Sequence, residues 1–191
     1  QDLDYSVTYL SNKNVGTAKV VICGKGVYTN SLTKTFTIRP ETMASAVITG
    51  CKAKYSYTGK QVKPLIQVVW NGKILRNNTD YTLLYKNNKK RGSAGIVVTG
   101  KGNYSGTLTA SFTIVRVSVK KASVTGLKAV YARTGKAVKP KVTVKLGGKK
   151  LKKKRDYILS YRKNKKKGTA LLYVKGVGNY SGTKKMKFKI R

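Results

Sequence analysis

Residues 80–114 read DYTLLYKNNKKRGSAGIVVTGKGNYSGTLTASFTI, and the framework of this stretch occurs three times in the chain. Asp80-Tyr81 recurs as Asp4-Tyr5 and as Asp156-Tyr157, always at an interval of 76 residues and without a gap. The same register repeats further positions of the quoted stretch, namely Tyr85, Asn88, Gly92, Gly100, Tyr104 and Phe112. A fixed period of this kind indicates an array of one repeated fold.

A second set of shared positions precedes the quoted stretch in two of the three copies. The set Tyr55, Thr58, Gly59, Val62, Lys63 and Pro64 recurs as Tyr131, Thr134, Gly135, Val138, Lys139 and Pro140. The first copy has no counterpart of this set. The chain is therefore predicted to contain the back half of a repeat over 1–40 and whole repeats over 41–116 and 117–191. It is also predicted to begin inside a larger protein.

The pattern of apolar residues predicts an all-β fold. Ile66, Val68 and Trp70 alternate with Leu65, Gln67 and Val69, as in a strand with one buried face. Asn71-Gly72 follows, the dipeptide preferred in tight hairpins. Further strands are expected near 45–54, 79–86, 93–99 and 107–115. About six short strands per repeat and no helical periodicity favour a β-sandwich or a small barrel.

The charge of the chain is strongly positive and unevenly distributed. Lysine and arginine total 42 against five acids, histidine is absent, and the net charge is +37. Residues 1–40 carry +3, residues 41–116 carry +10 and residues 117–191 carry +24. A net charge of +24 on a small domain causes electrostatic self-repulsion, and it is larger than the charge that solubility requires. The excess predicts a contact that depends on charge.

The last copy replaces neutral residues of the middle copy by lysine. Thr109, Ser111 and Thr113 correspond to Lys185, Lys187 and Lys189, while the intervening apolar positions stay apolar. Folding therefore does not require these lysines. The residues predicted to bind a polyanion are Lys141, Lys145, Lys149, Lys150, Lys152, Lys153, Lys154, Arg155, Arg162, Lys163, Lys165, Lys166, Lys167, Lys185, Lys187 and Lys189.

The chemistry expected of an enzyme is missing from the sequence. General acid and base catalysis needs titratable groups brought together, and three of the five acids are one position in three copies. We interpret that aspartate as a cap for backbone N–H groups. No catalytic, cofactor-binding or metal-binding residue is predicted, because His clusters, Cys pairs at ligand spacing and sets of carboxylates are lacking.

Glycines and aromatic residues have structural interpretations that we prefer to functional ones. Gly100-Lys101-Gly102 and Gly176-Val177-Gly178 resemble phosphate loops only superficially, because a strand and not a helix is expected next. They are interpreted as turns with positive φ. Tyr28, Tyr104 and Tyr180 are expected to close the core with a hydroxyl bonded to backbone. Trp70 is expected in the core, and Tyr173 is expected to point outward among cations, where contact with a sugar or a base is the alternative.

Cys23 and Cys51 lie outside the repeat pattern, near the meeting point of the first and middle copies. In an oxidising compartment they can form one disulfide. The alternative is two unrelated thiols.

The shared motifs resemble those of a known repeat family. Tyr-Thr-Gly-Lys-x-Val-Lys-Pro, the following Asp-Tyr and Tyr-x-x-Asn, and Gly-x-Gly-Asn-Tyr-Ser-Gly-Thr before Phe-x-Ile are similar to bacterial immunoglobulin-like repeats. The resemblance implies tandem β-sandwiches outside the cell, in secreted or surface proteins of Gram-positive and often gut-dwelling bacteria. In such proteins these repeats serve as stalks, spacers or attachment modules beside upstream domains.

Three functions remain open at this point. The first is attachment to an anionic polymer such as teichoic acid through the lysine-rich last copy. The second is a mechanical spacer for an upstream enzyme or adhesin. The third is adhesion to acidic host glycans or to nucleic acid, the latter without sequence specificity because no recognition helix or RNA-binding signature is present. No transmembrane segment and no cofactor are predicted.

Overall fold

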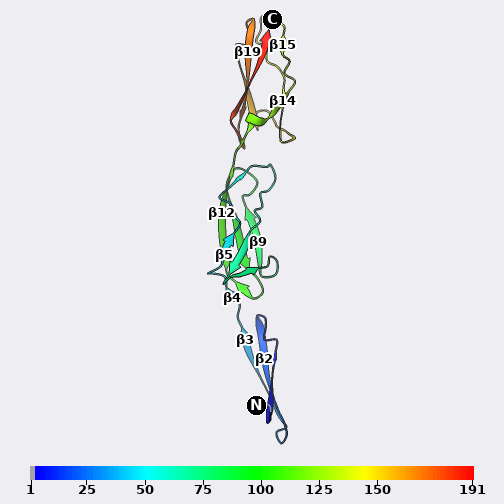
Figure 1. Ribbon diagram of the computed structural model, residues 1–191, viewed down its shortest axis with the longest axis vertical. Coiled ribbons are helices and arrows are strands. Elements are labelled where there is room, and N and C mark those ends of the chain that lie inside the picture. Colours follow the sequence, from blue (N-terminus) through cyan, green and yellow to red (C-terminus); the bar gives the residue numbers. More distant parts are fainter. Residues whose placement is uncertain (1–2) are drawn as a thin grey trace. The chain divides into compact units, whose positions relative to one another are not determined.

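The computed structural model describes residues 3–191 and contains strands as its main regular structure (Figure 1). Apart from one 3-10 turn, η1 (Val119–Lys121), the described residues form no helix. The prediction of an all-β fold is therefore confirmed.

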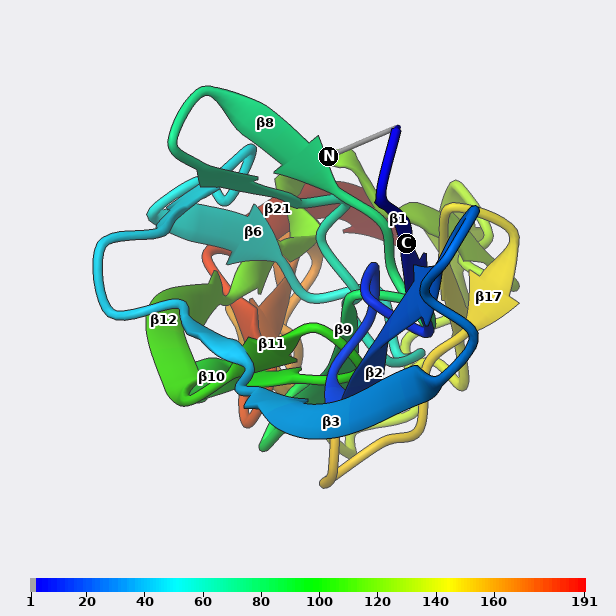
Figure 2. The ribbon, with the colours of Figure 1, turned by 90° about the horizontal axis from the view of Figure 1, so that it is seen from below.

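The back half at the start of the chain forms a sheet of three antiparallel strands. These are β1 (Tyr5–Leu10), β2 (Gly16–Gly24) and β3 (Ser31–Ile38), in the order β1-β2-β3. Tyr5 pairs with Gly24, and Ala18 pairs with Phe36. Figure 2 shows these strands from one end, with β3 following a curved path beside β2.

The middle copy contains nine strands. They are β4 (Glu41–Thr42), β5 (Val47–Thr49), β6 (Lys54–Ser56), β7 (Gln67–Trp70), β8 (Lys73–Leu75), β9 (Tyr81–Lys86), β10 (Gly92–Gly100), β11 (Tyr104–Ser105) and β12 (Thr107–Val115). They form sheets with the orders β5-β7-β8, β6-β12-β10-β9 and β11-β4.

The last copy repeats this arrangement. Its strands are β13 (Val117–Ser118), β14 (Ser123–Thr125), β15 (Val130–Tyr131), β16 (Thr143–Leu146), β17 (Lys149–Lys150), β18 (Tyr157–Arg162), β19 (Gly168–Gly176), β20 (Tyr180–Ser181) and β21 (Thr183–Ile190). The sheet orders are β14-β16-β17, β15-β21-β19-β18 and β13-β20. The 76-residue register of the sequence is thus also a register of strands and of strand pairing.

The number of strands differs from the expected six. The stretch expected as one strand near 45–54 forms two, β5 and β6, which enter different sheets. Gly50 separates them, with φ of 80° and its Cβ position only 2.7 Å from the Leu65 carbonyl oxygen. The two-residue strands of each copy were not expected, because so short a segment has no periodicity to read.

The hairpin expected at Asn71-Gly72 is confirmed. Trp70 pairs with Lys73 across it, and both turn residues have positive φ, 45° and 75°. Leu65 is exposed while Val68 is buried, as the alternation predicted. The Trp70 ring meets Tyr104 edge-on at 5.4 Å, and its Nε1 donates to the Thr42 carbonyl. Trp70 therefore closes the core from one side.

Contacts within the chain group it into two compact units. The first comprises Gln1–Ala53, Lys63–Asn87 and Ala94–Phe112, and the second comprises Lys54–Val62, Asn88–Ser93 and Thr113–Arg191. The repeat boundaries proposed from sequence, 1–40, 41–116 and 117–191, stay a prediction.

The second compact unit has a continuous apolar core of sandwich-like character. Side chains of both larger sheets meet there, together with η1. The fully buried members are Val119, Ala122, Val144, Leu151, Tyr157, Ala170, Leu172, Val174, Tyr180, Phe188 and Ile190. Strand alternation places the polar residues between them on the outside, and this arrangement positions the candidate site.

Candidate functional site

The outer face of the four-stranded sheet carries a row of lysines. On β21, Phe188 and Ile190 are buried, whereas Lys185, Lys187 and Lys189 are exposed. Alternate residues of a strand lie about 7 Å apart on one face. The three ammonium groups therefore form a regular cationic row over the sheet.

Pairing with β19 places apolar and aromatic side chains beside this row. Lys187 is paired with Leu171, and Lys185 is paired with Tyr173. Arg162 of β18 stacks over Tyr173, with its guanidinium carbon 5.7 Å from the ring centre. Tyr173 thus lies among cations as expected. Lys184 on the same strand is different, because its Nζ donates to the Ala122 carbonyl at 2.6 Å.

A second cationic region is a hollow beside the β16–β17 hairpin. Its volume is about 770 Å³. It is lined by Lys139, Pro140, Lys141, Val142, Thr143, Lys150, Leu151, Lys152, Lys153, Tyr157, Leu159 and Tyr161. The Tyr161 hydroxyl donates to the Pro140 carbonyl at 2.8 Å, which fixes one wall. Burial raises the pKa of both tyrosines, so they stay neutral at physiological pH.

The third cationic region is the loop between β18 and β19. Lys163, Lys165, Lys166 and Lys167 surround a hollow of about 560 Å³. Asn164 anchors this loop, because its Nδ2 donates to the Val138 carbonyl at 2.9 Å. The equivalent Asn88 makes the same bond to Val62. The shared asparagine is therefore structural. Around it, Lys165, Lys166 and Lys167 correspond to the cations Lys89, Lys90 and Arg91, whereas Lys163 corresponds to the neutral Asn87.

All sixteen residues predicted to bind a polyanion are exposed. Twelve fall into the three regions above, with Arg162 counted in the first region because it stacks over Tyr173 beside the lysine row. The other four are Lys145, Lys149, Lys154 and Arg155. Lys149 lies over the Tyr57 ring, 5.9 Å from its centre. Arg155 is engaged by Asp156, with Nη2 and Oδ2 2.9 Å apart, so its charge is partly neutralised.

Lys139 also lines the hollow, and the sequence comparison missed it. The sixteen residues were taken from strand positions that become lysine in the last copy and from two cationic loops, 149–155 and 162–167. Lys139 belongs to neither group, because it recurs as Lys63 and lies outside both loops. Lys139 becomes part of a cationic region because its neighbours change in the last copy. Leu65 and Ile74, which correspond to Lys141 and Lys150, are both exposed in the middle copy. The signal that could have found Lys139 was its position two residues before Lys141.

The repeated aspartate has the expected capping role in the middle and last copies, at Asp80 and Asp156, whereas Asp4 is exposed. Asp156 is buried and accepts from the Lys152 backbone N–H at 2.8 Å, and Asp80 accepts from the Arg76 backbone N–H at the same distance. Hydrogen bonds from the Arg155 side chain hold the pKa of Asp156 below its usual value, although burial alone would raise it. For Asp80, burial raises the pKa, and the hydrogen bonds from Arg76 outweigh it and lower the pKa overall.

The tyrosine prediction needs a correction. Tyr104 and Tyr180 are buried as expected, but the Tyr104 hydroxyl accepts from Lys73 Nζ at 3.1 Å. Hydroxyls that bond to backbone belong instead to Tyr85, Tyr131 and Tyr161. Tyr28 is exposed. In the middle copy, the hydroxyl of this turn tyrosine lies beside the Lys73 side chain of the β7–β8 hairpin.

The glycine prediction is correct for one glycine of each loop. Gly178 has φ of 63°, as a turn requires, and a strand follows each loop. Gly176 does not have positive φ. A Cβ at Gly176 would lie 2.7 Å from the Ser181 backbone N, so glycine is needed there for close approach of two backbone segments.

The two cysteines are both free thiols, with Cys23 exposed and Cys51 half-buried. Burial raises the pKa of the Cys51 thiol, which lowers its reactivity. The disulfide stays a prediction.

Comparisons with known proteins give no assignment. No protein-family model matches the chain, and neither a curated protein nor a solved structure matches it. Within residues 3–191, no three side chains of the metal-binding types gather into a cluster. The described part of the chain also holds no helix with the length and apolar character needed to cross a membrane.

Proposed function

We propose that the chain belongs to a secreted bacterial surface protein built from immunoglobulin-like β-sandwich repeats, and that residues 117–191 attach it to an anionic polymer of the cell wall. Teichoic acid is the polymer that fits this setting best. The lysine-rich surface, defined by the sixteen predicted residues, forms the contact. The segment does not need to catalyse a reaction for this role.

The observation that carries the proposal is the difference between two copies with the same backbone. The row Lys185, Lys187 and Lys189 replaces Thr109, Ser111 and Thr113 in equivalent strands, β21 and β12. The fold therefore tolerates neutral residues at these places. A charge of +24 on 75 residues disfavours folding by self-repulsion, and an anionic polymer removes that cost while it releases its own counterions.

The geometry also suits a flexible polymer better than a small ligand. The three cationic regions lie on exposed surface, and two of them are open hollows lined by several lysines. Lysine ammonium groups act as mobile point charges that follow a chain of phosphates without demanding one orientation. Affinity of this kind depends steeply on salt.

The test measures retention on wall teichoic acid over a range of salt concentrations. In the full chain, the triple variant Lys185→Thr, Lys187→Ser, Lys189→Thr should weaken binding. It should also reduce the slope of log affinity against log salt by about 2–3, close to one unit per lost phosphate contact. Heparin, mucin and DNA serve as parallel ligands, and tighter binding to one of them would assign the surface to that polymer.

A matched control separates local contact from total charge. Lys120→Ala, Lys121→Ser, Lys128→Thr removes the same charge from exposed positions outside the three regions. It should leave the slope within about half a unit of the parent. The reverse variant Thr109→Lys, Ser111→Lys, Thr113→Lys should strengthen binding. If retention does not change with salt, attachment by charge is wrong.

A spacer is the second candidate, and recurring contacts favour it. Asn103 Oδ1 accepts from the Val15 N–H, and Asn179 Oδ1 accepts from the Arg91 N–H, one repeat later. Such recurrence is typical of an array made to be extended by further copies. In this case a deletion of 117–191 would leave the protein on the cell. Loss of the deleted protein into the medium would support attachment instead.

A further inference from the structure

The three-stranded sheet β1–β3 exposes an apolar face that the other two copies bury. Tyr5 is 37% exposed, against 3% for Tyr81 and 4% for Tyr157. Tyr28 is 58% exposed, against 8% for Tyr104 and 5% for Tyr180. Phe36 is 41% exposed, against 2% for both Phe112 and Phe188. The residue types are identical, so the difference comes from what covers them.

The covering layer in the other copies is the front half of each repeat. Tyr104 meets Trp70 edge-on at 5.4 Å and lies beneath Lys73 Nζ. Phe188 meets Tyr131 edge-on at 5.4 Å, and Val144 of β16 joins the same core. Trp70 and Lys73 belong to 41–79, and Tyr131 and Val144 belong to 117–155. The sheet β1–β3 keeps the register of the covered sheets, with Tyr5 opposite Gly24 as Tyr157 is opposite Gly176.

The backbone of the turn after β2 also differs from its equivalents, which pair with a strand in the other two copies. Tyr104-Ser105 pairs in parallel with Glu41-Thr42, and Tyr180-Ser181 pairs in parallel with Val117-Ser118. Among the described residues, Tyr28 and Thr29 belong to no strand. Their equivalents obtain a strand partner from the first residues of a front half.

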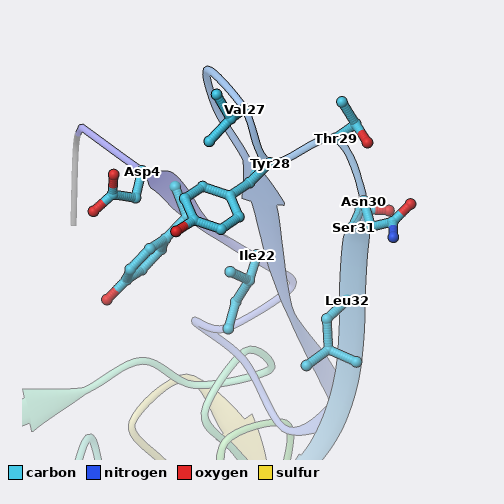
Figure 3. Close-up of a pocket in the computed structure, with 10 residues that line it drawn as sticks. Asp4, Ile22, Val27, Tyr28, Thr29, Asn30, Ser31 and Leu32 are labelled. Atoms are coloured by element: carbon cyan, nitrogen blue, oxygen red, sulfur yellow. The ribbon is translucent and has the colours of Figure 1, made fainter.

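Asp4 lies at the position where, in the other copies, the end of the front half donates a backbone N–H to the aspartate. Asp80 and Asp156 are buried and accept a backbone N–H from the residue four positions earlier. That residue, Arg76 or Lys152, lies near the end of the front half of its repeat. Asp4 is exposed at the rim of a hollow of about 650 Å³ that Tyr5, Ile22, Tyr28 and Leu32 also line. Figure 3 shows the Tyr28 ring in this hollow, with Asp4 on one side and Ile22 and Leu32 on the strands below.

We infer that the face of β1–β3 is a docking surface for a repeat front half of the kind seen in 41–79 and 117–155. The occupant is a polypeptide segment with a strand that pairs with Tyr28-Thr29, apolar side chains that cover Tyr5 and Phe36, and a terminal backbone N–H for Asp4. The same interface is formed twice inside this chain, so its shape and chemistry are known from those copies. Binding would convert three open strands into a closed sandwich-like unit.

The experiment uses the full chain and a variant in which a copy of residues 41–79 replaces residues 1–3, directly before Asp4. Amide hydrogen exchange is measured by mass spectrometry for β1, β2 and β3. The added segment should slow exchange of these strands at least about tenfold, toward the rates of β9, β10 and β12, because buried and paired amides open less often. A matched control carries Val68→Lys in the added copy, since Val68 is fully buried where it occurs naturally.

Each outcome has a defined meaning. Slower exchange with the added copy, lost in the Val68→Lys control, supports the inference. Unchanged exchange, or equal slowing by both segments, overturns it. If the parent chain already protects β1–β3 and sedimentation shows association that rises with concentration, the face binds a second copy of itself and the inference is wrong. Polymer binding by 117–191 is scored separately, so failure here does not bear on the proposed function.

Discussion

At the scale of single residues, Asp156 is the only acidic side chain in residues 117–191. It is buried, it caps the backbone at Lys152 and it pairs with Arg155. In a segment with 25 cations, a carboxylate on the surface would meet many competing partners. Because Asp156 is buried, its carboxylate accepts from the Lys152 backbone N–H and from the Arg155 side chain and is kept away from the other surface cations. This local role explains why the aspartate recurs at the same repeat position although the charge of the copies changes.

Asp156→Asn should destabilise the last copy and reduce its acid sensitivity. Loss of hydrogen bonds to a charged, buried acceptor costs about 1.5–3 kcal/mol. The folded pKa of Asp156 is depressed, so its contribution is complete above the unfolded value, about 3.9, and is lost as pH falls through the folded pKa. Urea unfolding at neutral pH and near pH 3 measures both effects.

Asp4→Asn is the control for this prediction. Asp4 occupies the same repeat position but is exposed, so its replacement should leave stability within about 0.5 kcal/mol of the parent at both pH values. Equal destabilisation by Asp4→Asn and Asp156→Asn would contradict the capping explanation.

Gly176→Ala should destabilise the chain by about 1–3 kcal/mol, because the new methyl group would press on the Ser181 backbone. Gly95→Ala is the matched change within an equivalent strand. There the nearest atom is 3.9 Å away, and the last copy carries Leu171 at this position. Thermal melts should show a lower Tm for the first variant only. An unchanged Tm for Gly176→Ala would show that the two backbone segments can separate at no cost.

At the scale of elements, the lysines on β21 are expected to oppose folding in the absence of polymer. The variant Lys185→Thr, Lys187→Ser, Lys189→Thr should raise Tm by a few degrees at low salt, because it removes like charges and supplies residues with higher β propensity. The gain should shrink in high salt as the charges are screened. A lower Tm at low salt would mean that the lysines stabilise the strand, which would remove the argument from self-repulsion.

Strands with clear alternation could be predicted from the sequence, as β7, β10 and β21 show. The turn at Asn71-Gly72 was also predictable, because positive φ restricts the residue types. The pairs β4–β11 and β13–β20 could not be predicted, since two residues have no periodicity and their partners lie about 63 residues away in the chain. Of the candidate site, the exposed lysines were predictable, whereas the hollow that adds Lys139 depends on tertiary packing.

At the scale of the whole molecule, the rise in charge from +3 to +24 along the chain should make stability depend unevenly on salt. Screening relieves self-repulsion most where charge is densest. Hydrogen exchange of β19 should therefore slow more than that of β10 when salt is raised from low to physiological levels. Both strands are long, central and matched in register, so they form an internal comparison. Equal slowing would contradict an effect of local charge.

The exposed loop between β18 and β19 affects how well the protein would resist proteases outside a cell. Lys163, Lys165, Lys166 and Lys167 are exposed and offer four cleavage sites to proteases of trypsin specificity, in the kind of loop where such enzymes cut first. A polymer seated on these side chains would cover those bonds. Protein attached to the polymer would then be digested more slowly than released protein. Limited trypsin digestion with and without teichoic acid would show whether the polymer protects the loop from cleavage.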